Sequence, residues 1–280
     1  MDALRRWDPC PEVGAASHIG RTHQRNEDAV QVGRATRDGL PFTAIVVCDG
    51  VSSSSRGDLA AAAAAEAAIE LLMGEAEGTG ELDPAHRQHL LRTAVHLAHE
   101  AACAAGIEQL VDRDPPGATI VAAVVYDGRV DTAWVGDSRA YLLSPPNSET
   151  PGELCVLLTH DHSWVNLVVD RGEMSQADAL DAPLAHAITH CIGPLENPDP
   201  AHPAEPSHSH AVVTVGSRLL LCTDGVWGYA ASPAAFCRLV GDNDDGTSAG
   251  DLAVELVRRS IAAGGDDDMT VGVAYVDGAL

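Results

Sequence analysis

Apolar runs and polar turns alternate along the first third of the chain, in a pattern typical of strands followed by helices. Val13–His18, Ala29–Val32 and Phe42–Cys48 are short apolar segments between turn residues, and we predict a strand at each. Asp58–Met73 and Pro84–Ala105 are longer and rich in Ala and Leu, residues that favour helices. This part of the chain therefore predicts strands beside two long helices.

The pattern returns to that of strands after the second helix. Four short apolar segments follow one another, joined by tight turns such as Asp127-Gly128. Such spacing predicts an antiparallel meander. The four segments are Thr119–Tyr126, Val130–Val135, Arg139–Leu143 and Leu154–Leu158.

Helices and strands are mixed in the remainder. A helical segment from about Ser163 to Asp181 precedes a Pro- and His-rich stretch that ends at His210. No repeat and no long linker divides the chain, so we predict one α+β domain with layered sheets. The last elements expected are strands at Val212–Val215, Leu219–Cys222 and Met269–Val276, and helices at Pro233–Val240 and Ala249–Ala263.

Composition and charge narrow the classes of function. The 17 basic residues against 41 acidic ones give a net charge of −24, which argues against nucleic-acid or anionic-membrane partners. No apolar window is long enough to span a bilayer, and the N-terminus lacks the apolar core of a signal peptide. The seven cysteines are scattered without a CxxC pair, which is typical of free thiols. We therefore expect a cytoplasmic protein.

Aspartates stand at the ends of several apolar strands. Asp49 follows AIVVC, Asp137 follows TAWVG, Asp224 follows LLLCT, and the cluster Asp266–Asp268 precedes the final strand. Carboxylates that converge from strand ends repel one another unless a cation neutralises them, and oxygen ligands suit Mg²⁺ or Mn²⁺. An Asp-Gly pair taken alone is more often only a turn. The four acidic positions taken together indicate a metal site.

A second polar segment, GRTHQRNEDA at 20–29, lies upstream of the first of these aspartates. It joins the acids Glu27 and Asp28 to the cations Arg21, His23 and Arg25. Taken alone, the segment is a charged turn. Its position before Asp49-Gly50 is what makes it a candidate part of the site.

The ordered motifs resemble those of the bacterial PPM-type Ser/Thr protein phosphatases, the metal-dependent type 2C family. The motifs are GRTHQRNEDA, VVCDGVSSSSRGDLAA, GAT, WVGDSRAYLL, LTHDHSWVNLVVDRGEMS, LLLCTDGVW and GGDDDMTVGV. The resemblance implies an α+β fold with a central antiparallel β-sandwich flanked by helices on both faces, in four layers α-β-β-α. It implies a single domain over 1–280, with a core at about 13–277 and a helical flap at about 163–197.

The resemblance also implies a role for each matching residue. Asp49 would bridge two metals and the carbonyl of Gly50 would bind one of them. Asp224 and Asp267 would be direct ligands, and Asp137 would bind a third, weaker ion. Glu27 and Asp28 would hold metal-bound waters.

The function implied is hydrolysis of phosphoserine or phosphothreonine on a phosphorylated protein. Two Mn²⁺ or Mg²⁺ ions, with a possible third at the weaker position, would activate a water for attack on phosphorus. By resemblance the enzyme would oppose a Ser/Thr kinase and act on the kinase or its targets. Two other interpretations remain open: a phosphatase dedicated to one regulatory phosphoprotein, of the sigma-factor antagonist type, and a non-catalytic module that binds phosphoproteins.

This chain departs from the family pattern at several positions. His23 stands where many relatives have a phosphate-contacting Arg, so His23, Arg21 and Arg25 are alternative phosphate ligands. Asp267-Asp268 stands where Asp-Asn is usual, which adds a negative charge.

A serine nucleophile is a further possibility that the sequence argues against. Ser138 in GDSRA would need a helix after it to act in this way, whereas RAYLL has the pattern of a strand.

Overall fold

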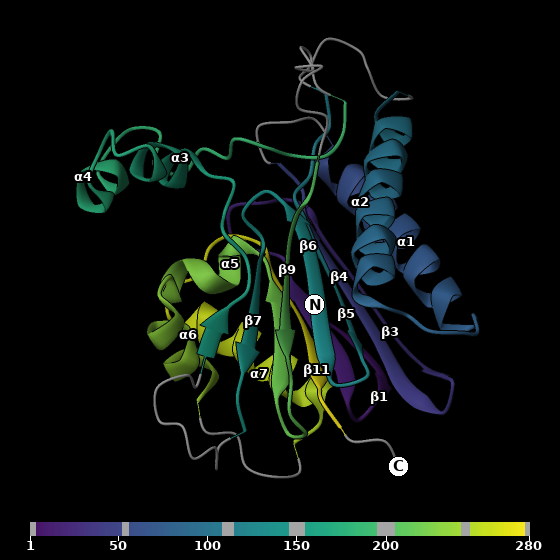
Figure 1. Cartoon of the computed structure of the whole chain (residues 1–280). Helices are drawn as coiled ribbons and strands as arrows, with labels where there is room; N and C mark the ends of the chain where they lie inside the picture. The colour runs from purple at the N-terminus through teal and green to yellow at the C-terminus, as the bar shows by residue number, and fades with distance from the viewer. Residues whose placement is uncertain are drawn as a thin grey trace.

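Two antiparallel sheets lie face to face with helices on both outer sides, in a computed structural model that describes residues 4–51, 56–107, 115–145, 155–194, 205–241 and 247–277 (Figure 1). The predicted α+β sandwich is confirmed. Residues 52–55 of the VSSSSRG motif and 195–197 at the end of the expected flap lie outside the described residues. No helix in the described ranges is long and apolar enough to cross a membrane.

One sheet has the strand order β1-β2-β11-β10-β7-β8. Its strands are β1 (Leu4–Cys10), β2 (Val13–His18), β11 (Met269–Tyr275), β10 (Arg218–Cys222), β7 (Arg139–Leu143) and β8 (Cys155–Leu157). The other sheet has the order β3-β4-β5-β6-β9. Its strands are β3 (Asp28–Arg37), β4 (Leu40–Asp49), β5 (Ile120–Tyr126), β6 (Arg129–Val135) and β9 (Ser207–Val212).

Two pairs of helices cover the outer faces. Helices α1 (Gly57–Ala76) and α2 (Pro84–Ile107) pack on the sheet of β3 and β4, while α6 (Pro233–Val240) and α7 (Ala249–Ala262) pack on the other sheet (Figure 1). A short helix, α5 (Asp224–Trp227), follows β10 directly. The described residues 163–194, here called the flap, contain α3 (Trp164–Asp170) and α4 (Gln176–Leu180) and project from the body.

Small side chains let α1 lie close to its neighbours. The buried residues of α1 are mostly alanines, among them Ala61, Ala64, Ala65 and Ala68, each without exposed area. Between the two sheets, larger side chains such as Ile45, Val121 and Leu221 are fully buried. Burial of this apolar area is the main stabilising contribution to the sandwich.

The predicted meander of four strands is wrong in its connectivity. Strands β5 and β6 pair in one sheet, but β7 and β8 pair in the other. The chain crosses between the sheets at Gly136, which has a φ of 106°, a conformation that glycine adopts readily. The pattern of short strands and tight turns does not reveal which turns change sheet.

Two edge strands were also misplaced or missed. The strand predicted at Val212–Val215 lies instead at Ser207–Val212, where His208 and His210 gave the segment the composition of a loop. Strand β1 was not predicted, since LRRWDPC is too polar to be recognised as a strand. Both strands lie at the edge of their sheet. An edge strand pairs with another strand on one side only and often carries polar residues.

His162 joins the base of the flap to the sheet of β6 and β9. The backbone N–H of Gly136 donates to His162 Nδ1 at 3.2 Å, so the ring proton is on Nε2, which lies 2.9 Å from the hydroxyl oxygen of Ser207. Burial, together with the charges of neighbouring His190 and His160, lowers the pKa of His162 to about 4. The neutral ring is therefore the form that the fold requires.

We predict that folding stability depends on pH through His162. The unfolded chain binds a proton at this ring below about pH 6.5, whereas the folded chain binds it only near pH 4. Stability therefore falls as pH drops from about 6.5 towards 4, by up to about 1.4 kcal/mol per pH unit. Denaturant unfolding of wild type and His162→Gln across this window measures the difference. Parallel curves for the two proteins would contradict the assignment.

Candidate active site

The acidic residues singled out in the sequence come from strand ends in both sheets. Strands β3 and β4 pair with Asp28 opposite Asp49. Asp224 opens α5 immediately after β10, and β10 pairs with β11, which Asp267 precedes by two residues. Asp137 lies in the crossing from β6 to β7. The pairing of these strands places the carboxylates on a rigid frame.

Electrostatic coupling shows that these carboxylates lie close together. Burial raises the pKa of Asp49 well above its usual range, and the charges of Asp28 and Asp224 raise it further. The pKa of Asp224 is raised by burial and then by Asp267. Burial, together with the charges of Asp224 and Asp161, raises the pKa of Asp137 to about 7. Each carboxylate thus makes ionisation of the next one harder.

Asp28 carries the clearest sign of a missing partner. Its Oδ2 accepts a hydrogen bond from the Thr223 hydroxyl at 2.9 Å, while its Oδ1 is buried without a hydrogen-bond partner. Buried carboxylate oxygens are costly unless paired. An all-oxygen donor set and an unpartnered buried oxygen fit a hard divalent cation or its bound water. Within the described ranges, however, no three Asp, Glu, His or Cys side chains are arranged so that they could hold a metal ion together.

Gly50 is held where only glycine fits. A Cβ added there would lie 2.6 Å from the carbonyl carbon of Gly57 and 2.8 Å from the carbonyl oxygen of Glu27. The Gly50 N–H donates to that Glu27 oxygen at 3.1 Å. The start of α1 and the GRTHQRNEDA segment therefore both pack against the turn after Asp49.

Two hydroxyls support the same turn. Thr119 donates its N–H to the Asp49 carbonyl at 2.8 Å, and its Oγ1 accepts from the Asp49 N–H at 3.3 Å. The Thr119 Oγ1 lies 2.7 Å from Ser138 Oγ. Ser138 is buried and β7 continues after it as a strand, as expected for a structural residue and not for a nucleophile. The GAT motif contained Thr119, but the sequence did not indicate this bonding role.

Asp268 organises the GRTHQRNEDA segment, a role that the sequence did not predict. Its side chain is only 3% exposed. Oδ1 accepts the Gly20 N–H at 2.7 Å, and Oδ2 accepts the Glu27 N–H at 2.7 Å. Both oxygens therefore act as acceptors at once, which an amide side chain cannot do. Asp268, which adds a negative charge where the family usually has Asn, therefore holds the backbone of this segment in place.

The three phosphate candidates differ in their surroundings. His23 Nδ1 lies 3.2 Å from Asp268 Oδ2 and 3.4 Å from Asp267 Oδ1. Burial lowers the His23 pKa, but the hydrogen bond and charge of Asp268 outweigh burial and leave the pKa above its ordinary value. Arg25 lies at the surface, 4.0 Å from Asp58, and Arg21 is exposed. His23 is thus the candidate cation nearest Asp267.

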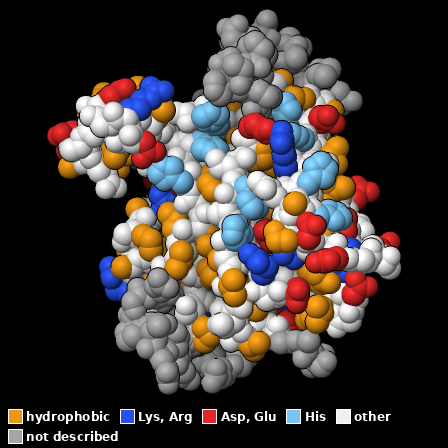
Figure 2. Space-filling view, in the orientation of Figure 1, with side chains coloured by type: hydrophobic (Ala, Val, Ile, Leu, Met, Phe, Trp, Pro, Cys, Tyr) orange, Lys and Arg blue, Asp and Glu red, His pale blue; other side chains and the backbone are white. Residues whose placement is uncertain are grey.

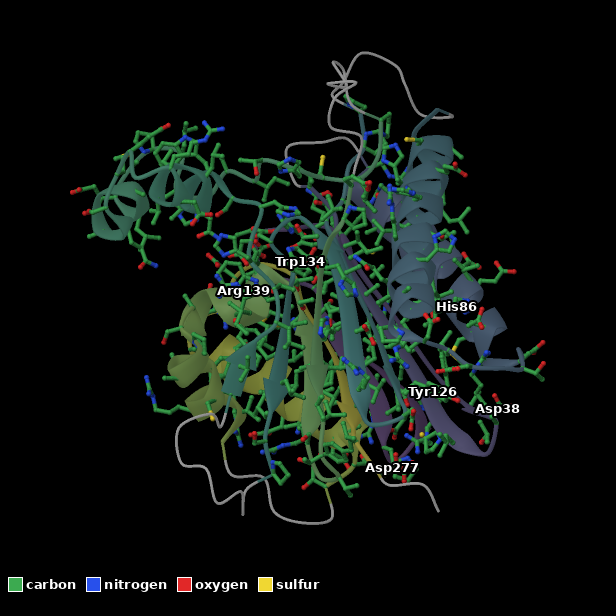
Figure 3. The ribbon with its side chains drawn as sticks, in the orientation of Figure 1. Asp38, His86, Tyr126, Trp134, Arg139 and Asp277 are labelled. Atoms are coloured by element: carbon green, nitrogen blue, oxygen red, sulfur yellow. The ribbon has the colours of Figure 1, made fainter. Side chains whose placement is uncertain are left out.

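Arg139 of β7 links the segment just before the flap to α5, near this site. It forms a buried ion pair with Asp161, with Nη2 at 2.7 Å from Oδ2, and its Cζ lies 3.5 Å from the centre of the Trp227 ring. Trp227 in turn donates its Nε1–H to the carbonyl of Asp137 at 3.0 Å. Figure 3 shows Arg139 at the end of the sheet that lies nearest the flap.

Histidines also gather elsewhere. Figure 2 shows them over α2 and β9. The α2 histidines lie near carboxylates, with His86 3.7 Å from Glu75 and His96 3.8 Å from Glu205. They belong to the polar face of this amphipathic helix.

Comparison with known proteins identifies the family. The sequence pattern that defines protein phosphatase 2C matches residues 15–243. The serine/threonine phosphatase stp of Listeria monocytogenes is 30% identical over 209 residues, which are 74% of each chain. The serine/threonine protein phosphatase PstP of Mycobacterium tuberculosis is 26% identical over 264 residues, 94% of this chain but 44% of PstP. The chain belongs to the protein phosphatase 2C family.

A solved structure agrees with this membership. The catalytic domain of PstP in complex with two manganese ions superposes with a TM-score of 0.68 at 25% identity, over 98% of this chain and 99% of that one. This chain therefore has the fold of that domain. It spans less than half the length of full PstP.

We predict that Asp268→Asn destabilises the fold even though it restores the residue usual in the family. The amide would leave one of the partly buried N–H groups of Gly20 and Glu27 without its acceptor, at a cost of about 1 kcal/mol. Urea unfolding measures the change. Asp266→Asn is the matched control, because Asp266 is an exposed neighbour that bonds only Tyr229 through its side chain. Equal stability of the two variants would contradict the bonding role.

Proposed function

We propose that this protein is a metal-dependent phosphatase that hydrolyses phosphoserine and phosphothreonine on proteins. The observation that carries the proposal is the electrostatic coupling of Asp49, Asp224 and Asp137 at one end of the sandwich, in a chain of the protein phosphatase 2C family. Such a concentration of acids on rigid strand ends is unfavourable without bound cations.

We propose Asp49, the Gly50 carbonyl, Asp224 and Asp267 as ligands of two divalent cations. Asp137 would hold a third, and Glu27 and Asp28 would accept from coordinated waters. Two manganese ions in the PstP structure support a dinuclear centre of this kind. When bound, the cations supply a water of lowered pKa and neutralise phosphate oxygens. Mn²⁺ and Mg²⁺ both suit these ligands.

The chain's own residues have three tasks in this proposal. The hydrogen bonds of Thr119 to Asp49 hold that carboxylate at the end of β4. Asp268 holds the segment that carries Glu27 and Asp28. His23, whose pKa is lowered by burial but raised above its ordinary value by the hydrogen bond and charge of Asp268, would contact a phosphate oxygen, with Arg21 and Arg25 as alternatives.

The substrate we propose is a phosphorylated protein, either a Ser/Thr kinase or a target of one. The relatives named as serine/threonine phosphatases support this class of substrate. Cytoplasmic localisation and one phosphatase domain over residues 1–280 are likewise proposals, which rest on the sequence pattern.

We predict that Asp224→Asn lowers kcat by far more than about tenfold, the effect of 1.36 kcal/mol, because a charged ligand is lost. Hydrolysis of a phosphothreonine peptide with Mn²⁺ measures it. Asp127→Asn, in the β5–β6 turn, is the control and is expected to keep full activity. A folded Asp224→Asn that retains more than about a tenth of the rate would refute the assignment.

We predict that Mn²⁺ raises the melting temperature. A cation bound only by the folded state adds about 2.7 kcal/mol at a hundredfold excess over Kd. Melting curves in EDTA and in Mn²⁺ test this without an activity assay, and Asp49→Asn should reduce the shift. An unchanged melting temperature in metal-free wild type would be evidence against the centre.

A further inference from the structure

A tyrosine just after α5 is hydrogen-bonded to the acidic loop that precedes β11. Tyr229 lies in a short 3₁₀ helix, η1 (Gly228–Ala230), which continues directly from α5. Its hydroxyl donates to Asp266 Oδ1 at 2.9 Å and accepts from the Asp266 N–H at 3.3 Å. One oxygen atom makes both bonds, so the loss of a single hydroxyl would remove both.

Asp266 also receives a second set of hydrogen bonds, from the GRTHQRNEDA segment. Its backbone carbonyl accepts from the N–H of Arg21 at 2.7 Å, and from the N–H and the hydroxyl of Thr22 at 3.1 and 3.0 Å. Gly20 packs so closely here that a Cβ on it would lie 2.4 Å from the same carbonyl oxygen. Tyr229 therefore holds the acidic loop and, through it, the start of this segment.

The two bonds of Tyr229 join the segments that carry two of the proposed metal ligands. Asp224 begins α5, on the same continuous helical segment as Tyr229, and Asp267 directly follows Asp266. Strands β10 and β11 pair as far as Cys222 opposite Val271, and both ligands lie beyond this last pair. The Tyr229 hydroxyl is thus a side-chain link between Asp224 and Asp267 where the strand pairing has ended.

Packing in the apolar core does not explain Tyr229. The residue is 43% exposed, whereas Tyr141 of β7 is fully buried. Substitution by Phe would keep the ring of Tyr229 and remove only its hydrogen bonds. The effect of the hydroxyl can therefore be measured with little disturbance of the fold.

We infer that Tyr229 is a positioning residue of the proposed metal centre, which keeps Asp267 at a fixed place relative to Asp224 by bonding Asp266. The inference rests on the proposed function, because Asp224 and Asp267 are metal ligands only within it. Loss of a residue that orients a ligand without touching the metal typically costs about 10–100-fold in metal affinity or activity. We expect Tyr229 to act on the affinity for Mn²⁺ and not on the reaction once the ions are bound.

The test measures Mn²⁺ binding directly, by titrating the metal-free full chain and following the EPR signal of free Mn²⁺. Tyr229→Phe is expected to weaken Mn²⁺ binding by about tenfold. Its kcat at saturating Mn²⁺ should stay close to that of the wild type. Tyr275→Phe is the matched control, because it removes a hydroxyl from the opposite end of β11, and it should bind Mn²⁺ as the wild type does.

Two variants of Asp266 separate positioning from charge. Asp266→Asn removes the negative charge but keeps an oxygen that can accept from the Tyr229 hydroxyl, whereas Asp266→Ala removes both. If positioning is the cause, Asp266→Asn binds Mn²⁺ nearly as tightly as the wild type, and Asp266→Ala binds it as weakly as Tyr229→Phe. Equal weakening in the two Asp266 variants would assign the effect to charge and overturn the inference.

The remaining outcomes distinguish this inference from the proposed function. Unchanged Mn²⁺ affinity in Tyr229→Phe, beside a wild type that binds the ion, would overturn the positioning role alone. A fall in kcat at saturating Mn²⁺ without a change in affinity would do the same. If the wild type binds no Mn²⁺, the proposed metal centre is wrong, and the role of Tyr229 falls with it.

Discussion

Mutual repulsion among carboxylates is the constraint around which this end of the molecule is built. Asp49, Asp224 and Asp137 each raise the cost of ionising a neighbour, and burial adds to that cost. Flexible loops would let such groups separate. Here paired strands hold them in place, the backbone of Asp49 is hydrogen-bonded to Thr119, and neighbouring Asp28 accepts a hydrogen bond from the Thr223 hydroxyl. The free energy that keeps them together comes from the apolar cores on both sides of each sheet.

The sequence predicted most of the frame and the acidic residues, because both leave local signals. Short, nearly continuous apolar runs mark the buried strands, and aspartates after them mark the strand ends. What it did not predict depends on distant partners. The change of sheet at Gly136 and the edge strands β1 and β9 are not visible in a local pattern. The same holds for Asp268, which bonds Gly20 and Glu27 from more than two hundred residues away.

The departures from the family pattern make physical sense as a set. His23 Nδ1 and Asp268 Oδ2 lie 3.2 Å apart, so the added carboxylate and the histidine that stands in place of the usual Arg are direct neighbours. A sequence alone presents them as two separate anomalies, since they lie at opposite ends of the chain.

The alanine face of α1 limits how this protein can diverge over evolutionary time. A larger residue at Ala61 or Ala64 would push the helix outward, and with it Gly57, which packs against Gly50 beside Asp49. Substitutions on this helix are therefore confined to its solvent side, at positions such as Glu66 and Glu70. The flap carries no such coupling through α1. Substitutions in the flap would therefore leave the turn after Asp49 in place, whereas substitutions on the inner face of α1 would move it.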